Sequence, residues 1–453
     1  MKLKDVFKAN DIRGIYGKIL DDELAYKVGR AVAKFLRCKE IFIGRDMRLS
    51  SVRLFRSLVK GFIESGVDVI DLGLVDTPSI YFMTGLYKKP GIMITASHNP
   101  ANYNGIKIVK PGARPIDSYN GFDEILRIIE HKDFIEGKKK GKVIKKDIFF
   151  QYKKHALSFV DSRKIENLKV VIDAGNGMAG EIIPSVYKDL NIKIIPLYFK
   201  LDGHFPNHIP NPILKENIRD LQKKVLQNKA DFGFAFDGDM DRVVFIDEKG
   251  RFVNASFIGA LLVKFLLECC KIKNRDAIIY SSAASRIVRE VALKYDGKPL
   301  REKVGHAFIK ERMRKTNALF GMEHSAHYYY RNNYYADSGL ITSLLMLEIY
   351  SLAKKQGLRF SDLFKEFDKY FQADEISINL LDDKDVMDRI ERYYKIKKPK
   401  KIDHFDGLTV EFEDYWFSIR KSNTEPLLRV NLEARDEKTM KEKLREVLKV
   451  IKK

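Results

Sequence analysis

The chain contains little cysteine, tryptophan or proline. Its 453 residues include three cysteines, one tryptophan and 13 prolines. Cys38 stands alone and Cys269 adjoins Cys270, so the cysteines form neither a disulfide framework nor a CxxC zinc motif. We expect all three to be core residues. Because 45% of the residues are hydrophobic and 11% aromatic, a disordered, collagen-like or low-complexity chain is excluded as well.

Long apolar runs are also missing. No segment approaches the ~20 consecutive apolar residues that a membrane-spanning helix needs. The N-terminal MKLKDVFKANDIRG has no apolar stretch of the signal-peptide type. We therefore expect a cytoplasmic protein with no membrane partner.

Acidic residues are in the minority. The chain has 83 Lys and Arg against 62 Asp and Glu, which gives a net charge of +21. Such a field attracts anions without selecting among them. The basic stretch 395–401 has no interleaved aromatic residues, so we interpret it as a solvated loop. A nucleic-acid-binding protein remains a distant alternative, to be tested by the loss of binding at moderate salt.

The order of strand and helix patterns predicts four domains, within the two to four that the length allows at roughly 100–200 residues each. Near the N-terminus, strand patterns at 40–46, 67–73 and 91–95 alternate with helix patterns, the first of which Ser50 is expected to cap. Similar alternation follows the charged stretch 137–146, interpreted as a boundary, and resumes after about residue 251. The last segment has alternating strands and an amphipathic helix.

The predicted fold class is therefore α/β. We expect three similar α/β domains with mixed, parallel-dominated sheets, followed by a small C-terminal α+β domain. The predicted limits are 1–146, 147–250, 251–367 and 368–453.

Three aspartates alternate in the segment DGDMDR, between two strand patterns. Asp237, Asp239 and Asp241 supply the hard oxygen ligands that suit Mg²⁺ or Ca²⁺. An EF-hand is disfavoured because Arg242 occupies the position that needs glycine and the flanks are strands. A charged hairpin turn stays an alternative, although it would place three like charges in one short loop.

The segment GNGMAG at 175–180 matches a dinucleotide-binding pattern, with Asp202 placed to take a ribose. A nicotinamide-dependent dehydrogenase is therefore a second distant alternative, testable by cofactor absorbance on binding. The same glycines would also serve an ordinary tight turn from strand to helix.

Two loops carry candidate reactive groups. TASHNP places Ser97 and His98 directly after a strand, where a nucleophile could be exposed on a rigid support. RKSNTEPLLR, from Arg420 to Arg429, combines guanidinium, hydroxyl and amide donors that could cradle a phosphate.

Together these segments resemble the α-D-phosphohexomutase family, and within it the phosphomannomutase/phosphoglucomutase group. The motifs that carry the resemblance span the chain in this order: NDIRG, GRD, TASHNPANYNGIK, DAGNG, DGHFPNHIPNP, DGDMDR, VGH, EHSAH, DSG and RKSNTEP. The resemblance implies a heart-shaped arrangement around a central cleft, with a C-terminal domain of the TATA-box-binding-protein-like type.

The resemblance also implies roles for the site residues. Ser97, beside His98, matches the phosphorylated serine, and Asp237, Asp239 and Asp241 match the ligands of an Mg²⁺ that bridges to Ser97. The matching basic and histidine residues are Arg13, Lys107, Arg242, His306 and His327. His327 is the first candidate for proton transfer, and the general base is left open because Ala283 falls near the position where some relatives carry a catalytic lysine.

Two further groups match substrate-binding motifs. Glu323 and Ser325 match the residues that recognise the sugar. The phosphate-binding loop is matched by Arg420, Ser422, Asn423, Thr424 and Arg429.

The implied reaction interconverts hexose 1-phosphate and hexose 6-phosphate, for mannose, glucose or both. It passes through a phosphoserine enzyme and a bisphosphorylated sugar, with glucose 1,6-bisphosphate or mannose 1,6-bisphosphate as intermediate and activator. Phosphoglucosamine mutase of the same family is the alternative. A phosphosugar is the expected partner, nucleic acid is not, and the sequence sets no expectation for the oligomeric state.

Overall fold

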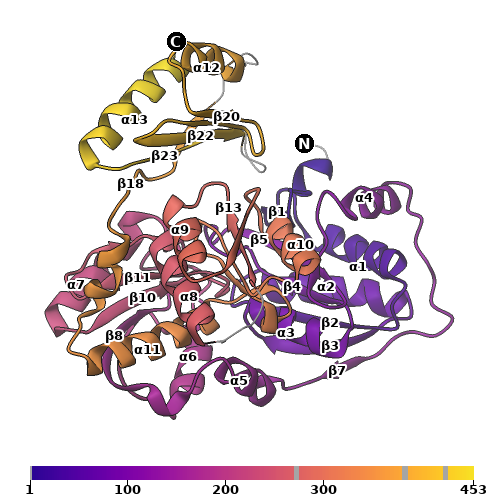
Figure 1. The fold of residues 1–453 in the computed structure, drawn as a ribbon. Helices are drawn as coiled ribbons and strands as arrows, with labels where there is room; N and C mark the ends of the chain where they lie inside the picture. The colour runs from indigo at the N-terminus through magenta and orange to yellow at the C-terminus, as the bar shows by residue number, and fades with distance from the viewer. Residues whose placement is uncertain (1–2, 270–274, 380–385, 422–426, 453) are drawn as a thin grey trace.

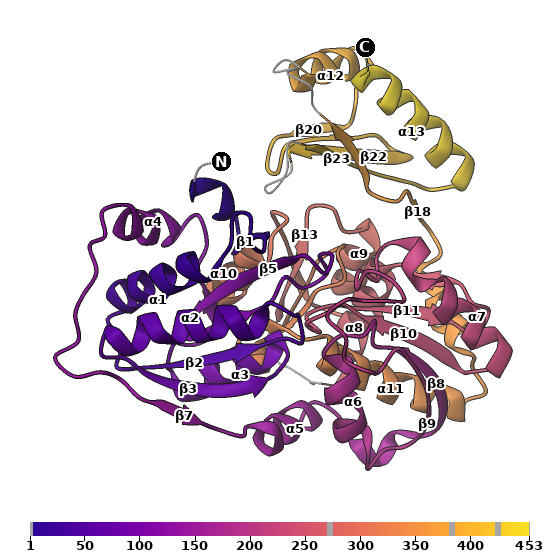
Figure 2. The same cartoon turned by 180° about the vertical axis from the view of Figure 1, so that it is seen from behind.

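The computed structural model describes residues 3–269, 275–379, 386–421 and 427–452. The chain forms four units, each built on its own sheet. Three units lie side by side, and the C-terminal unit stands above them, reached through strand β18 (Phe371–Gln372) (Figures 1 and 2). The predicted fold class, three α/β units and a C-terminal α+β unit, is confirmed.

The first unit holds a seven-stranded mixed sheet in the order β1-β5-β4-β2-β3-β7, with β6 on β5. Its strands are β1 (Ile12–Ile15), β2 (Glu40–Arg45), β3 (Asp68–Leu74), β4 (Gly91–Ile94), β5 (Tyr103–Lys110), β6 (Arg114–Pro115) and β7 (Val143–Lys145). Its helices are α1 (Asp22–Leu36), α2 (Ser51–Glu64), α3 (Thr77–Tyr87) and α4 (Phe122–Glu130). Alternate side chains of β2 serve opposite faces: Ile41 and Ile43 join the core under α1 and α2, whereas Phe42 joins the core under α3.

One local expectation for this unit needs correction. Ser50 does precede α2, but its hydroxyl makes no capping bond and instead accepts a hydrogen bond from the Asn104 Nδ2, at 2.8 Å. Part of the charged stretch 137–146, interpreted as a boundary, forms β7, which pairs in parallel with β3 at the edge of the sheet. An edge strand tolerates this polar composition because one side of it faces solvent.

The second unit has a five-stranded sheet in the order β12-β11-β10-β8-β9. Its strands are β8 (Glu166–Asp173), β9 (Asn191–Leu197), β10 (Phe232–Phe236), β11 (Val243–Asp247) and β12 (Phe252–Val253), and its helices are α5 (Phe149–Leu157), α6 (Ala179–Tyr187) and α7 (Arg219–Asn228). Every residue of β10 and β11 is buried. The two strands run antiparallel, so the loop between them turns back at one end of the sheet.

The third unit has another five-stranded sheet, in the order β14-β13-β15-β16-β17. Its strands are β13 (Ala277–Ser281), β14 (Lys298–Glu302), β15 (Phe320–Met322), β16 (Tyr328–Tyr330) and β17 (Ala336–Asp337). The helices of this segment are α8 (Ala255–Cys269), α9 (Arg286–Lys294), α10 (His306–Thr316) and α11 (Gly339–Lys355). Helix α11 packs on β8 and β11 of the second unit, so the two units share one layer.

The fourth unit is antiparallel throughout, as the alternating pattern predicts. It contains β18, β19 (Ile376–Asn379), β20 (Lys401–Asp403), β21 (Leu408–Glu411), β22 (Tyr415–Lys421) and β23 (Leu427–Ala434), with helices α12 (Val386–Lys395) and α13 (Glu437–Ile451). One apolar core runs through the first three units, whereas the fourth unit has a core of its own.

The cysteine expectation is wrong in one case. Cys269 is exposed, because it lies in the last turn of α8, beyond the buried run of that helix that ends at Val263. Cys38 is partly buried, and Cys270 lies outside the described residues. Within the described part of the chain, none of the helices has the length and apolar character needed to cross a membrane.

Candidate active site

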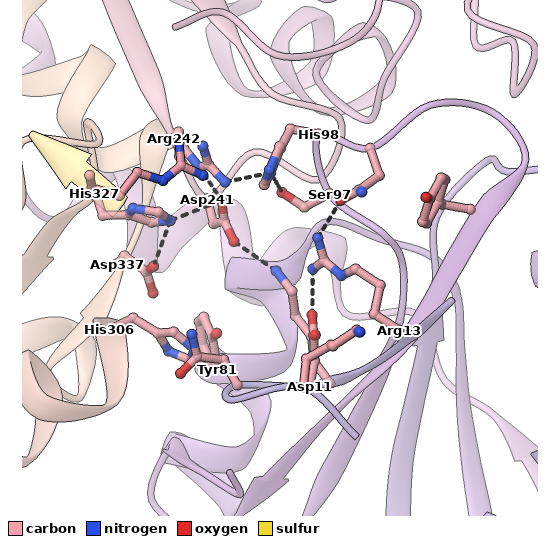
Figure 3. Close-up of a pocket in the computed structure, with 16 residues that line it drawn as sticks. Asp11, Arg13, Tyr81, Ser97, His98, Asp241, Arg242, His306, His327 and Asp337 are labelled. Carbon is pink, nitrogen blue, oxygen red and sulfur yellow. Dashed lines mark hydrogen bonds and ion pairs between the residues drawn. The ribbon is translucent and has the colours of Figure 1, made fainter. Parts of the chain in front are cut away.

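A cavity of about 540 Å³ lies where the four units meet. Its lining comes from the segment before β1, β1, α3, the loop after β4, β5, the β10–β11 loop, α10, the β15–β16 loop, β17 and β23. Figure 3 shows side chains from the first three units facing one another in it. Residues predicted from the sequence that line it are Arg13, Ser97, His98, Lys107, Asp241, Arg242, His306, His327 and Arg429. Motifs far apart in the chain therefore share one site.

Ser97 lies in the loop that follows β4. Its φ of 49° is in the left-handed region, and its N–H donates to Thr95 Oγ1 at 2.8 Å. The hydroxyl is buried, donates to Asp237 Oδ2 at 2.7 Å, and has His98 Nδ1 at 3.1 Å. Since non-glycine residues rarely adopt this conformation, the surrounding contacts must hold Ser97 in it.

The three predicted aspartates converge in the loop between β10 and β11. Asp237, Asp239 and Asp241 are buried, and one oxygen from each lies within 4.8 Å of the others. Burial, together with the neighbouring carboxylates, raises the pKa of Asp237 well above its usual value. Burial alone would raise the pKa of Asp241 too, but Lys107 and His327 hold it well below its usual value.

These residues fit a divalent metal ion. Oδ1 of Asp239 is buried and has no hydrogen-bond partner within the described protein, and Oδ1 of Asp241 has only the longer contacts to His327 Nε2 at 3.5 Å and Arg242 Nε at 3.8 Å. Such oxygens cost free energy unless something binds them. The donor set consists of carboxylate oxygens, which hard cations prefer. We conclude that the loop is suited to hold a metal ion.

Three basic side chains surround the carboxylates. Lys107 Nζ lies 2.7 Å from Oδ2 of both Asp239 and Asp241. Burial alone would lower the pKa of Lys107, but these two carboxylates raise it well above its usual value. Arg13 pairs with Asp11 and also donates to the loop residue Asn99. The ammonium and guanidinium groups create a site for an anion beside the acidic loop.

Arg242 completes this basic set. Its backbone N–H donates to Asp237 Oδ1 at 3.1 Å, and its guanidinium donates to His98 Nδ1 (Figure 3). Burial and the positive charges of Arg242 and Arg13 lower the pKa of His98 well below its usual value. His98 is therefore neutral at pH 7, with Nδ1 acting as an acceptor.

The other two predicted histidines lie across the cavity. Burial, with Lys310 and Lys107 nearby, lowers the pKa of His306 well below its usual value. His327 Nδ1 is 3.0 Å from Ser325 Oγ, and His327 Nε2 is 3.5 Å from Asp241 Oδ1. His327 thus connects the β15–β16 loop to the aspartate loop.

The predicted sugar-binding residues Glu323 and Ser325 both contact His327, which lines the cavity. Neither Glu323 nor Ser325 is among the residues that line the cavity. Glu323 Oε1 accepts from the Gly305 N–H at 2.8 Å, and Oε2 accepts from the Tyr329 hydroxyl. The Glu323 carboxylate is thus already bonded to two protein donors.

The predicted phosphate-binding loop is described only at its ends. Ser422, Asn423 and Thr424 lie outside the described residues. Arg429 on β23 lines the cavity, whereas Arg420 on β22 does not. Arg420 donates to Glu375 Oε2 at 2.9 Å, and the Arg429 guanidinium lies 3.7 Å from Glu375 Oε1.

Several residues of the site were not singled out from the sequence. Asp11, Tyr81 and Asp337 line the cavity, and Asp337 forms a buried ion pair with Lys310 at 2.7 Å. Asp11 stands within NDIRG and Asp337 within DSG, so the motifs themselves held the signal. No motif marks Lys310, Tyr81 or Glu375.

The glycines of GNGMAG have a packing role. A Cβ on Gly177 would lie 2.8 Å from the Gly238 carbonyl oxygen, and one on Gly180 would lie 1.9 Å from the Phe199 carbonyl oxygen. The segment therefore allows close approach of the aspartate loop.

Comparison with known proteins covers the whole chain. Four phosphoglucomutase/phosphomannomutase family profiles match in order: alpha/beta/alpha domain I at residues 4–136, domain II at 149–250, domain III at 254–370 and the C-terminal domain at 366–450.

Individual relatives agree. The phosphomannomutase of Vibrio cholerae is 40% identical over 466 aligned residues, covering 100% of this chain and 99% of the relative. That of Escherichia coli K12 is 39% identical, covering 96% of both chains. The crystal structure of a phosphoglucomutase/phosphomannomutase family protein from Burkholderia thailandensis matches with a TM-score of 0.88 at 30% identity, covering 100% of this chain and 98% of that one. The chain therefore belongs to the phosphoglucomutase/phosphomannomutase family and is a phosphohexomutase.

Proposed function

We propose that this phosphohexomutase carries the transferred phosphoryl group on Ser97. One observation carries the proposal: the buried Ser97 hydroxyl lies 2.7 Å from Asp237, in a cavity that joins the aspartate loop to basic side chains. A phosphoryl group on Ser97 would face Lys107, Arg13 and Arg242, whose charges stabilise a transferring phosphoryl group.

The reaction then has two half-reactions at one site. A bond forms between phosphorus and a free hydroxyl of the hexose phosphate, which gives up its proton to a general base. The bond between Ser97 Oγ and phosphorus breaks, and Ser97 Oγ keeps the bonding pair and takes up a proton to become a hydroxyl again. The bisphosphate turns around, and its other phosphoryl group returns to Ser97. Holding both reactants in one cavity makes each transfer effectively intramolecular.

His327 is the proposed proton acceptor for the attacking sugar hydroxyl. It lines the cavity, and its ring nitrogens lie near Ser325 Oγ and Asp241 Oδ1. A histidine within reach of a substrate hydroxyl can act as a general base and later return the proton. His98 and His306 are proposed to stay neutral and to donate or accept hydrogen bonds at the phosphoryl group.

Mg²⁺ is the proposed metal ion. Asp237, Asp239 and Asp241 would hold it, together with an oxygen of the phosphoryl group on Ser97. When bound, Mg²⁺ would offset negative charge on the transferring group. Activity should disappear when the enzyme is verified metal-free after EDTA treatment and return with Mg²⁺; full turnover of the metal-free enzyme would refute the assignment.

Both glucose and mannose phosphates are the proposed substrates, with the corresponding 1,6-bisphosphates as activators. The relatives at 40% and 39% identity are named phosphomannomutases, and the matching profiles name both activities. The two sugars differ only at C2, whereas Glu323 and Ser325 are proposed to hold the 3- and 4-hydroxyls. We therefore expect kcat/KM values within about tenfold, or about 1.4 kcal/mol. A gap above about a hundredfold would show that another group reads C2.

The test of the central proposal is chemical. Protein treated with glucose 1,6-bisphosphate should carry phosphate on the peptide that contains Ser97, as detected by mass spectrometry. Ser97→Ala should lose nearly all turnover. Ser65→Ala is the matched control, because Ser65 is a buried serine of the same unit whose hydroxyl donates to the Gly61 carbonyl oxygen of its own helix. A fully active Ser97→Ala variant would refute the mechanism.

Two further expectations stay predictions: a cytoplasmic location, and domain limits at 1–146, 147–250, 251–367 and 368–453.

A further inference from the structure

We propose that Arg48 is a positioning residue that fixes the loop carrying Ser97, an inference that rests on the proposed role of Ser97. The Arg48 side chain donates to four carbonyl oxygens, three in that loop and the fourth at Tyr103, where β5 begins. NH1 donates to Pro100 at 2.7 Å and Tyr103 at 3.0 Å, and NH2 donates to Ser97 at 2.9 Å and Asn99 at 2.6 Å. One guanidinium therefore holds most of the turn.

Burial makes these hydrogen bonds strong and costly to lose. The Arg48 side chain is 0% exposed, and its charge is balanced by Asp46, whose carboxylate lies 3.3 Å from Nε. Asp46 is itself held by the Arg48 N–H and the Ser51 hydroxyl. Charged donors bind carbonyls more strongly than neutral ones, and the planar fork of arginine reaches several acceptors that a lysine cannot reach together.

A segment of the second unit covers Arg48 from the other side. The Phe205 ring centre lies 4.9 Å from the guanidinium carbon, and a Cβ on Gly203 would lie 2.9 Å from Arg48 Cα. Both residues belong to DGHFPNHIPNP, none of whose described residues lines the cavity. The contacts with Arg48 give this motif a structural role. They give one also to Arg48 itself, which stands two residues after GRD.

The same contacts act on the geometry of Ser97. Its carbonyl is held by Arg48 on one side, and a Cβ on Gly238 of the aspartate loop would lie 2.5 Å from that carbonyl oxygen. The carbonyl is thus confined between Arg48 and the loop that holds Asp237. Arg48 thereby keeps Ser97 at its φ of 49°, with the hydroxyl directed at Asp237. A displacement of about 1 Å at such a group can cost about 100-fold in rate.

The experiment compares Arg48→Met with Arg45→Met. Arg45 is the last residue of β2, three residues before Arg48, but its guanidinium donates to Asp71 and lies over Phe55. For Arg48→Met we expect kcat to fall at least about 100-fold, while KM for glucose 1-phosphate changes less than about threefold. Hydrogen exchange should accelerate in the peptide covering 95–103 and not elsewhere. Arg45→Met should retain kcat and the exchange rate of that peptide.

Several outcomes would overturn the proposal. One is an Arg48→Met enzyme whose kcat and hydrogen-exchange rates equal those of the wild type. Another is faster hydrogen exchange throughout the first unit, with kcat falling only in proportion to the fraction of unfolded protein. If Arg48→Met does not fold, Arg48→Lys, which keeps the charge, is judged by the same readouts. Ser97→Ala is assayed in parallel: full activity there would refute the proposed function, whereas exchange of peptide 95–103 in Arg48→Met tests the positioning separately.

Discussion

Two groups of side chains lie in or beside the same cavity and differ in how their charges are buried. The inner group comprises Ser97, Asp237, Asp239, Asp241 and Lys107; the exposed fraction of Asp239 is 0% and that of Lys107 is 13%. The clamp group comprises Arg420, Arg429 and Glu375, and the last two are 26% and 25% exposed. In the inner group buried charges face one another, whereas in the clamp group one partly exposed carboxylate serves two guanidinium groups.

The two groups also differ in what supports them. The inner group stands on an apolar core shared by the first three units, and the clamp group stands on β22 and β23 of a unit with its own core. Polar contacts join that unit to the third, such as the Arg301–Asp403 ion pair at 2.9 Å. The groups proposed to react are therefore held by burial, and the groups proposed to grip the non-reacting phosphate are held by exchangeable ion pairs. Ion pairs of that kind can be replaced by a phosphate.

The largest effect is expected from breaking the buried ion pair beneath His327. Asp337→Asn leaves the Lys310 ammonium buried without its partner, which should lower the free energy of unfolding by about 3–5 kcal/mol. Urea unfolding measures the change. In Lys215→Ala the lost pair with Asp374 is exposed, so the change should be only about 0–1 kcal/mol. Equal losses in the two variants would contradict the contrast between buried and exposed charges.

Asp239→Asn tests the inner group directly. The substitution removes one charge from the proposed metal loop, and we expect kcat to fall about 100- to 1,000-fold, as for other preorganised electrostatic groups. Steady-state assays over a range of Mg²⁺ concentrations measure this. Asp247→Asn is the control, because Asp247 lies at the far end of β11 and bonds to the turn at Lys249 and Arg251. If Asp239→Asn left kcat and its dependence on Mg²⁺ unchanged, Asp239 would not be a ligand of the metal ion.

Arg420→Ala tests the clamp group. A charge-assisted contact to phosphate is worth roughly 1.5–3 kcal/mol, so kcat/KM should fall about ten- to a hundredfold. The matched control is Arg435→Ala, since Arg435 lies just beyond β23 and is 59% exposed. If kcat/KM were unchanged for both the 1-phosphate and the 6-phosphate, the clamp would lie elsewhere.

The smallest effect concerns pH and the segment that covers Arg48. Burial alone would lower the pKa of His208, but Asp173, 3.1 Å from Nε2, raises it above its usual value. Because the folded-state pKa exceeds the unfolded one, the stabilisation is complete below the unfolded value of about 6.5 and is lost as pH rises through the folded value. Unfolding free energies between about pH 5.5 and 8.5 should show this loss, and His208→Gln should lack it. An identical pH profile in the variant would exclude the effect.

Local patterns along the chain predicted much of the fold. Strands β2, β3 and β4 and helix α3 fall where the apolar periodicity places them, because burying those faces is a local requirement of the sequence. Short sequence motifs also predicted part of the candidate site. Ser97 and the three aspartates stand in segments whose residue types suit phosphoryl transfer and metal binding. The prediction that Ser50 caps helix α2 is wrong, because Asn104, which is distant in sequence, donates a hydrogen bond to the Ser50 hydroxyl instead.

By itself, the sequence determined the fold class, the order of the units and the chemical types present at the site, since periodicity and short motifs depend on neighbouring residues. Only the tertiary structure decided which charges meet. The placement of α11 on the second sheet, the Lys310–Asp337 pair, the hold of Glu375 on Arg420, and the four carbonyls around Arg48 all join residues far apart in the chain. Such contacts depend on how whole sheets pack, and burial then sets the strength of each charge.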